Sequence, residues 1–222
     1  MIQFPVSSQS TLYRSQRLDG GGAYHIYSAI FTVELAWFLS QQLQSQAAWK
    51  IGIVCPYLAQ ATLVEKMIAA VIKEKNAEES FQITTGTVHS FQGDEFDILL
   101  NLLNAPPLIS PNIFLNNQNI LNVAMSRAKD YLIFILPETE EGLTQLKRLK
   151  TILNDNQIKP FVQQFTSADI EKILFNQADY IEENSLITTH QKINVYRKPE
   201  QKYQVTCSDK VVDVLLDVEK FF

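Results

Sequence analysis

The sequence has few cysteines and glycines, and it contains no long apolar run. Its 222 residues include 2 cysteines, Cys55 and Cys207, and 7 glycines. No CxxC pair and no Cys/His cluster occurs, which argues against a zinc site, and so few cysteines are typical of a reducing compartment. The longest apolar runs, residues 67–72 and 131–136, are far shorter than the ~18 residues of a membrane span. The N-terminus lacks the pattern of a signal peptide, so we expect a cytoplasmic protein without a membrane partner.

Basic residues are fewer than acidic ones. The chain has 19 Lys and Arg against 24 Asp and Glu, which gives a formal net charge of −5. This balance is a mild argument against nucleic-acid binding, because such proteins usually present a basic face. It does not decide the question, because a groove can be locally basic or can bind through backbone amides and hydroxyls. The 46 % of hydrophobic residues is typical of a folded globular chain and argues against disorder.

A phosphate-binding loop is also missing. The Walker A pattern GxxxxGK[ST] needs a Gly-Lys dipeptide, and this sequence has none. Gly20 to Gly22 fit neither that pattern nor GxGxxG. The acidic residues Asp94, Glu95 and Asp97 precede an apolar strand, whereas Walker B carboxylates follow one. We therefore expect that this chain alone does not hydrolyse a nucleoside triphosphate well.

The apolar pattern predicts helices and strands in alternation. Helices are predicted over residues 29–43, 58–75, 120–128 and 138–153, and strands over 51–55, 81–88, 96–103 and 131–136. The near-continuous apolar run 96–103 is typical of a parallel sheet that is covered on both faces. The predicted fold class is therefore α/β, with an open, mostly parallel sheet flanked by helices.

The pattern divides the chain into three parts. Residues 1–28 are predicted to be irregular, 29–153 to form the α/β domain, and 154–222 to form a small α+β appendage. In the appendage we expect a helix over 167–175 capped by Ser167, and short strands over 192–196, 203–207 and 211–216. Its basic and aromatic residues either touch nucleic acid or form a solvated face: Lys192, Tyr196, Arg197, Lys198, Lys202 and Tyr203.

Two segments carry chemistry. In residues 86–97, GTVHSFQGDEFD, the groups Thr87, His89 and Ser90 offer donors suited to phosphate oxygens. Gln92 and Glu95 suit a sugar hydroxyl or a water, and Gly93 permits a tight turn or the close approach of a ligand. The alternative is a polar loop before a buried strand.

The second segment, residues 121–129, is a predicted helix of small apolar residues that contains Arg127. This is the only arginine between Arg17 and Arg148. A guanidinium suits phosphate because it is planar, permanently charged and bidentate. The alternatives are a structural ion pair or a favourable place near the helix C-terminus.

In this order, the segments resemble motifs of the superfamily 1 helicases, in particular the group that contains the RNA helicase of nonsense-mediated decay. TVHSFQGDEFD resembles motif V, NVAMSRAKDYLIF resembles motif VI, and the upstream IGIVCPYLAQ (residues 51–60) resembles motif IV. The resemblance covers residues 29–140 and implies the second RecA-like domain of such an enzyme, a P-loop NTPase-type fold without its P-loop. The first RecA-like domain of the same polypeptide would carry the phosphate loop.

The resemblance also implies roles for single residues. ATP with Mg²⁺ would bind between the two domains, with Arg127 as the arginine finger. Glu95 would contact the ribose hydroxyl, Gly93 would lie near the γ-phosphate, and Gln92 would link nucleotide to nucleic acid. Tyr57 and Gln60 would lie near the interdomain cleft. The phosphates of single-stranded DNA or RNA would lie along three side chains: Thr87, His89 and Ser90.

The sequence departs from this family at several positions. The family's arginine pair before motif VI is replaced by Asn119 and Ile120, the loop 104–119 holds no arginine, and the QYRMHP-like segment before motif IV is absent. The leading hypothesis remains the C-terminal motor half of a helicase. The alternative is a stand-alone nucleic-acid-binding or protein-binding domain without ATPase activity. A weaker third hypothesis is a metal-dependent nuclease built on Asp94, Glu95 and Asp97 or on the acidic C-terminus.

Overall fold

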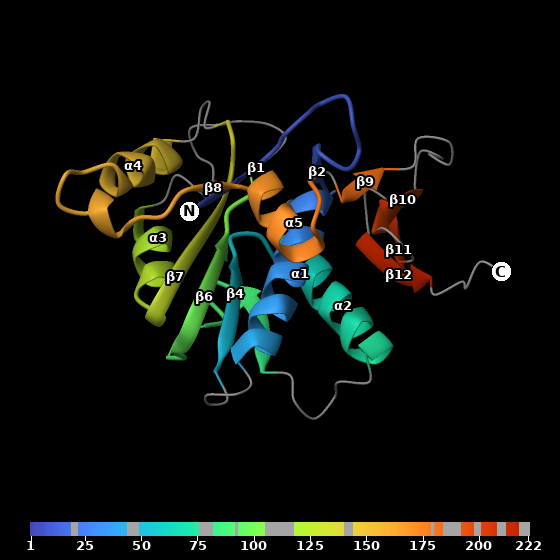
Figure 1. Ribbon diagram of the computed structural model, residues 1–222, viewed down its shortest axis with the longest axis horizontal. Coiled ribbons are helices and arrows are strands. Elements are labelled where there is room, and N and C mark those ends of the chain that lie inside the picture. Colours follow the sequence, from blue (N-terminus) through green and yellow to red (C-terminus); the bar gives the residue numbers. More distant parts are fainter. Residues whose placement is uncertain are drawn as a thin grey trace.

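A six-stranded parallel sheet forms the centre of the molecule (Figure 1). The computed structural model describes residues 1–18, 22–43, 49–75, 82–91, 93–104, 118–139, 144–178, 180–183, 192–197, 201–207 and 212–217. The strand order is β5-β4-β6-β7-β1-β8, and all neighbouring pairs are parallel. The strands are β5 (Ile83–Thr87), β4 (Ile51–Cys55), β6 (Phe96–Leu102), β7 (Ala128–Pro137), β1 (Ile2–Phe4) and β8 (Phe165–Thr166).

Helices cover both faces of this sheet (Figure 1). On one face, α1 (Ile26–Leu43), α2 (Leu58–Lys75) and α5 (Ser167–Phe175) share the largest apolar core with the strands. On the other face, α3 (Gln118–Met125) and α4 (Thr144–Leu153) pack against β7 through Leu121, Phe134, Leu136, Leu146 and Leu149. The predicted α/β class with an open parallel sheet is therefore confirmed. No helix in the described ranges is both long and apolar enough to span a bilayer.

The sheet includes strands from outside residues 29–153. Within residues 1–28, predicted to be irregular, β1 lies between β7 and β8, and β2 (Ser15–Arg17) pairs antiparallel with β3 (Ala23–His25). Residues 165–166 form β8 at the edge of the same sheet. Strands of two or three residues are too short to show an alternating pattern, so sequence periodicity does not reveal them. The division into three domains stays a prediction.

Hydrogen bonds explain two of the differences between the predicted and the observed helix starts. Glu138 is not helical, because its N–H donates to the Phe4 carbonyl at 2.9 Å and its carboxylate accepts from the Val6 N–H, so it joins β7 to β1. At α5 the cap is Thr166 and not Ser167. The Thr166 hydroxyl accepts from the Asp169 N–H, and the Asp169 carboxylate accepts from the Thr166 N–H. This reciprocal capping box places the first helical residue at Ser167.

The C-terminal part contains an antiparallel sheet in the order β12-β11-β10-β9. Its strands are β9 (Ile181–Glu183), β10 (Lys192–Arg197), β11 (Gln201–Cys207) and β12 (Val212–Asp217). Lys198 lies outside the described residues. A buried hydrogen bond from the Tyr27 hydroxyl to Glu171 joins α5 to α1, and Glu171 also accepts from the Tyr180 N–H at 2.8 Å. Burial and the neighbouring Glu171 raise the pKa of Tyr27, so this phenol remains protonated.

Gly52 makes room for an aromatic side chain in the centre of the sheet. A Cβ atom at Gly52 would lie 2.7 Å from Cγ of Phe96 and 2.8 Å from a methyl carbon of Leu99. Phe96 is buried and stacks obliquely on Phe91, with ring centroids 4.8 Å apart. Gly52 in β4 therefore leaves the space that the ring of Phe96, the first residue of β6, occupies.

His25, the last residue of β3, and Gln60 of α2 form a buried polar link. The His25 N–H donates to Oε1 of Gln60 at 2.6 Å, and Nε2 of Gln60 donates to the His25 carbonyl at 3.3 Å. The His25 ring accepts from the Ser28 N–H at Nδ1, so Nε2 carries the proton that it shares with the Tyr13 carbonyl. Burial lowers the pKa of His25 to about 4, although the hydrogen bond to Tyr13 opposes this shift.

We expect Gly52→Ala to lower the free energy of unfolding by about 1–3 kcal/mol, because overpacking a core forces side chains out of their rotamers. Urea denaturation of the two proteins measures this difference. The double variant Gly52→Ala/Phe96→Leu should recover part of the loss. Equal losses in the single and double variants would show that Phe96 is not the obstacle.

We expect the free energy of unfolding to fall as the pH drops from about 6.5 to about 4, partly through His25. The folded pKa is lower than that of the unfolded chain, so the unfolded state binds more protons in this window. The slope from this residue is at most about 1.4 kcal/mol per pH unit. Urea denaturation of wild type and His25→Asn across pH 4–7 tests the assignment, and an unchanged slope in the variant would contradict it.

Candidate functional site

The connection from β5 to β6 has eight residues and leads from the carboxyl edge of the sheet back to its amino edge. β5 and β6 are both parallel to β4 and lie on its two sides, so residues 88–95 begin at the carboxyl edge and end at the amino edge. Parallel strands usually need a crossover of a dozen or more residues. Val88 and Phe91 are buried against Val54 and Leu99, and they hold this connection on the face that also carries α3. The motif V segment therefore reaches both edges of the sheet.

At the amino edge, Arg127 and Glu95 lie at the starts of neighbouring strands. The Phe96 N–H, directly after Glu95, donates to the Arg127 carbonyl at 2.9 Å. Glu95 forms a 3.6 Å ion pair with Lys129, and the two side chains are 61 % and 48 % exposed. An ion pair this exposed contributes little to stability, so Glu95 can exchange this partner for a ligand at small cost.

Arg127 lies in a turn two residues after α3, and not inside the predicted helix 120–128. At this helix end the Ser126 hydroxyl donates to the Val123 carbonyl at 3.0 Å, a side-chain bond of the kind that competes with the helical pattern. The Nε atom of Arg127 is buried and has no hydrogen-bond acceptor, and the described part of the chain shows no ion pair to Arg127. A buried unpaired donor costs free energy, so this guanidinium is suited to an anion from outside the described residues.

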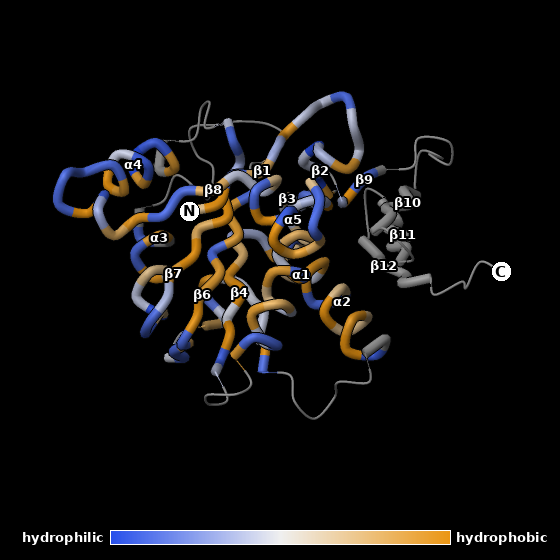
Figure 2. The backbone as a smooth tube through the Cα atoms, in the orientation of Figure 1, coloured by the Kyte–Doolittle hydropathy of each residue, from blue (hydrophilic) through white to orange (hydrophobic). Residues whose placement is uncertain are grey.

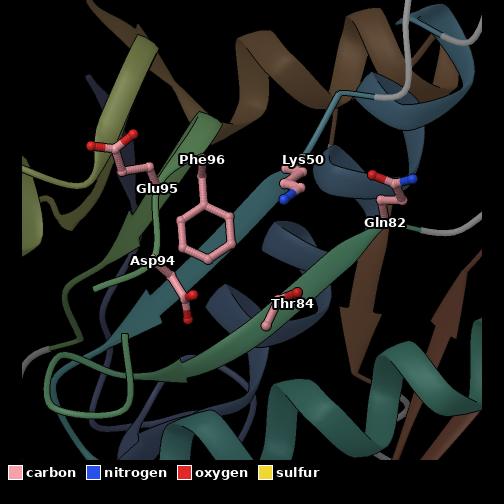
Figure 3. A pocket seen from close by; sticks show the side chains of 6 residues that line it. All are labelled: Lys50, Gln82, Thr84, Asp94, Glu95 and Phe96. Atoms are coloured by element: carbon pink, nitrogen blue, oxygen red, sulfur yellow. The ribbon is translucent and has the colours of Figure 1, made fainter. Parts of the chain in front are cut away.

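A shallow hollow of about 260 Å³ opens at the amino edge, with Glu95 in its lining (Figure 3). It is lined by Lys50, Gln82, Thr84, Asp94, Glu95 and Phe96. Figure 3 shows the Phe96 ring in the middle of the hollow, with Asp94 beside Thr84 and with Glu95 turned toward the other side of β6. Charges of both signs at its rim suit a polar ligand.

Asp97 has a structural partner. Its carboxylate accepts from the Lys50 N–H at 2.7 Å, and its own N–H donates to the Lys50 carbonyl at 3.0 Å. These bonds hold the starts of β4 and β6 together. The described residues contain no group of three or more His, Cys, Asp and Glu side chains placed to hold a metal ion, so the nuclease hypothesis gains no support from Asp94, Glu95 and Asp97.

At the carboxyl end of β5, Thr87 begins a tight turn. Its carbonyl accepts from the Ser90 N–H at 3.0 Å and from the Ser90 hydroxyl at 2.8 Å. Gly86 is needed for this turn, because a Cβ there would lie 2.2 Å from Oγ of Ser90. His89 and Ser90 are exposed, and Thr87 is half-buried. The turn thus brings the three predicted strand-binding side chains together at the edge opposite Arg127.

The other predicted nucleotide contacts are not gathered at the amino edge. Gln60 is fully buried, with its amide bonded to the His25 backbone. Tyr57 is half-buried and follows the carboxyl end of β4, away from Arg127 and Glu95. Gln92 lies outside the described residues. Gly93 has φ = +99°, and a Cβ added to it would meet no described atom within 4 Å, so its surface is open.

Sequence reasoning missed several residues at these edges. It gave no role to Lys50, although this lysine stands directly before the apolar strand 51–55. Gln82 and Thr84 join the hollow only through the pairing of β5 with β4, which the sequence does not show. Asn101 and Asn104 are fully buried, and their side-chain amides have no hydrogen-bond partner in the described part of the chain.

Comparisons with known proteins give a family match and one similar helicase. A family described as "AAA domain" matches residues 14–138. The chain is also similar to the mouse (Mus musculus) protein described as "Probable helicase senataxin", with 28 % identity over 123 residues. That match covers 55 % of this chain and 4 % of the mouse protein, so this chain spans a small part of the relative's length.

Gly86→Ala and Gly93→Ala should both destabilise the chain, for different reasons. At Gly86 the added Cβ meets Oγ of Ser90, so Gly86→Ala/Ser90→Ala should recover part of the stability. At Gly93 the cost is backbone strain of about 1–2 kcal/mol, which Ser90→Ala should not relieve. Thermal melting of the single and double variants measures both effects. Equal rescue at the two positions would contradict this distinction.

Proposed function

The match over residues 14–138 means that the chain belongs to the AAA domain family. On this premise we propose that the chain is the second motor half of an ATP-dependent helicase of superfamily 1. The proposed group is the one related to the RNA helicase of nonsense-mediated decay. Its substrate is single-stranded DNA or RNA. The similarity to a mouse protein described as a probable helicase supports this class. The observation that carries the proposal is the buried, unpaired Nε of Arg127 at the amino edge of the sheet.

Arg127 acts as the arginine finger of an ATP site shared with a first RecA-like domain. Its carbonyl is bonded to the Phe96 N–H, which fixes the backbone, while its guanidinium has no ion pair within the described residues. A permanent positive charge held this way meets the γ-phosphate as negative charge is redistributed in the transition state. Such a finger contributes ~10³-fold or more to the rate.

Glu95 and Gly93 complete this chain's share of the nucleotide site. Glu95 binds the ribose hydroxyl in exchange for its exposed ion pair with Lys129. The open surface at Gly93 allows a phosphate to approach the backbone closely, and Gln92 links this point to the nucleic acid. Mg²⁺-ATP, when bound, supplies the phosphoanhydride bond whose hydrolysis drives the motor. Tyr57 and Gln60 are assigned to the cleft by the family resemblance alone.

Thr87, His89 and Ser90 bind the phosphates of the single strand. They lie on one turn at the carboxyl end of β5, and His89 and Ser90 are exposed. Hydroxyl and imidazole donors hold phosphates without reading the base sequence. The Ser90 hydroxyl would exchange its bond to the Thr87 carbonyl, 2.8 Å long, for a phosphate oxygen. The eight-residue connection 88–95 joins this turn to Gly93 and Glu95, so it links strand binding with the nucleotide site.

Arg127→Ala in the complete enzyme should reduce ATP turnover by about 10³-fold and leave nucleotide binding nearly unchanged. Strand-stimulated phosphate release measures the turnover, and a fluorescent ATP analogue measures the binding. Lys172→Ala is the matched control, since it removes an exposed charge from α5, on the opposite face of the sheet. Equal losses of binding and turnover in Arg127→Ala would rule out the finger role.

The reading frame upstream of the Met1 codon tests the remaining candidate, a binding domain without ATPase activity. The absence of a phosphate loop in these 222 residues keeps that candidate open. An in-frame GxxxxGK[ST] followed by a Walker B strand supports the motor half. A stop codon and a native start at Met1 favour the binding domain, because Arg127 would then lack a phosphate loop in its own polypeptide.

A further inference from the structure

The segment 144–164 is basic in an acidic chain. It holds Lys147, Arg148, Lys150 and Lys159 against a single acid, Asp155, whereas the whole chain has 19 basic and 24 acidic residues. The segment consists of α4, a loop and the 3₁₀ turn η2 (Lys159–Phe161). It projects at the left of the molecule, and much of it is hydrophilic (Figures 1 and 2).

One side of α4 is buried, and the other lines an open hollow. Leu146, Leu149 and Leu153 pack into the core. The opposite side of α4 carries polar residues at helical spacing: Lys147, Lys150, Thr151 and Asn154. Together with Asp155 and Asn156 they line a hollow of about 760 Å³. This hollow therefore presents two lysines and several polar groups on one surface.

The single carboxylate in this hollow is already engaged. Oδ1 of Asp155 accepts from the Gln157 N–H at 2.9 Å, and the Asp155 carbonyl accepts from the Lys159 N–H at 2.7 Å. Asp155 thus holds the turn that leads to η2. Two lysines stand against this one carboxylate in the lining, so the net charge of the hollow is positive, which suits a polyanion.

An exposed aromatic ring lies on the same segment, at the end of η2. Phe161 is 86 % exposed at the end of η2, near Pro160. Ile158 and Phe165 nearby are 38 % and 40 % exposed. Basic side chains combined with exposed aromatic rings are the pattern with which proteins bind single strands, because phosphates pair with the cations and bases stack on the rings.

The basic segment and the Thr87–Ser90 turn lie at the same edge and on the same face of the sheet. α4 follows the carboxyl end of β7, and Thr87 ends β5. Val123 of α3 packs against the cluster that holds Val88 and Phe91, while Leu121 of α3 packs against Leu146 and Leu149. β5 and β7, whose carboxyl ends lead to the two places, are three strand steps apart, which is about 14 Å. A single strand of several nucleotides exceeds this spacing between the strands.

We propose that α4 and η2 form a second contact for the single strand, with Lys147 and Lys150 binding phosphates and Phe161 stacking on a base. This inference rests on the proposed function, because it takes single-stranded nucleic acid as the ligand. It adds a binding surface outside the three helicase-like motifs. It also explains how an acidic chain holds a polyanion.

The test is fluorescence anisotropy of labelled single-stranded oligonucleotides of 4 and 16 nucleotides titrated with the 222-residue chain. Lys147→Ala/Lys150→Ala should lower the salt dependence of binding to the 16-mer by about 1.4 in the logarithmic slope. Phe161→Ala should weaken binding of the 16-mer about tenfold. Both should leave the 4-mer nearly unchanged, because it occupies only the Thr87–Ser90 turn.

Two controls separate this surface from net charge and from the proposed function. Lys73→Ala/Lys172→Ala removes two charges from the helices of the opposite face, and it should leave both oligonucleotides bound as in wild type. Thr87→Ala/Ser90→Ala should weaken binding of both lengths. Circular dichroism confirms that each variant is folded.

Three results would overturn the inference. If the α4 and Phe161 variants bind the 16-mer as wild type while Thr87→Ala/Ser90→Ala weakens it, the second contact is wrong and the proposed function stands. If wild type binds neither oligonucleotide, both proposals fail. In the third result, polyglutamate binds as tightly as the 16-mer and displaces it, and this competition is lost in Lys147→Ala/Lys150→Ala. The surface then belongs to an acidic protein partner.

Discussion

The short connection between β5 and β6 is the constraint on which the site depends. Eight residues must return along a strand about 16 Å long, and they leave no room for a crossover helix. Gly86 admits the turn at one end, Gly93 takes a left-handed backbone at the other, and Val88 and Phe91 anchor the middle in the core. The same constraint places the Phe96 ring over β4, where Gly52 leaves space for it.

This geometry separates the chemistry of the chain into two edges. Donors for a strand lie at the carboxyl end of β5, whereas Glu95 and Arg127 lie at the starts of β6 and β7. The link between His25 and Gln60 and the hydrogen bond from Tyr27 to Glu171 hold the opposite helical layer together. The two edges therefore share a stiff sheet, and the ligands proposed for them do not compete for space.

The sequence predicts the parts of the fold that have strong periodicity. The strand 51–55 and the helix 58–75 have the predicted bounds, because their apolar patterns are uninterrupted. Strands such as β1 and β8 are invisible to the same reasoning, since two or three residues hold no period. The motif segments direct attention to Glu95 and Arg127, but only strand register shows that these residues are neighbours, and only packing shows that Gln60 is bonded to His25.

The position of β1 has a consequence for the order of folding. Within the described sheet this strand pairs with β7 and β8. Ile2 lies opposite Ile135 of β7 and opposite Phe165 of β8. During synthesis the backbone groups of β1 have no partner strand until more than a hundred further residues have emerged. By then β4, β5 and β6 can already pair with one another. Contacts so distant in sequence slow folding. The nascent chain thus carries β1 without its partner strands until β7 and β8 have been synthesised.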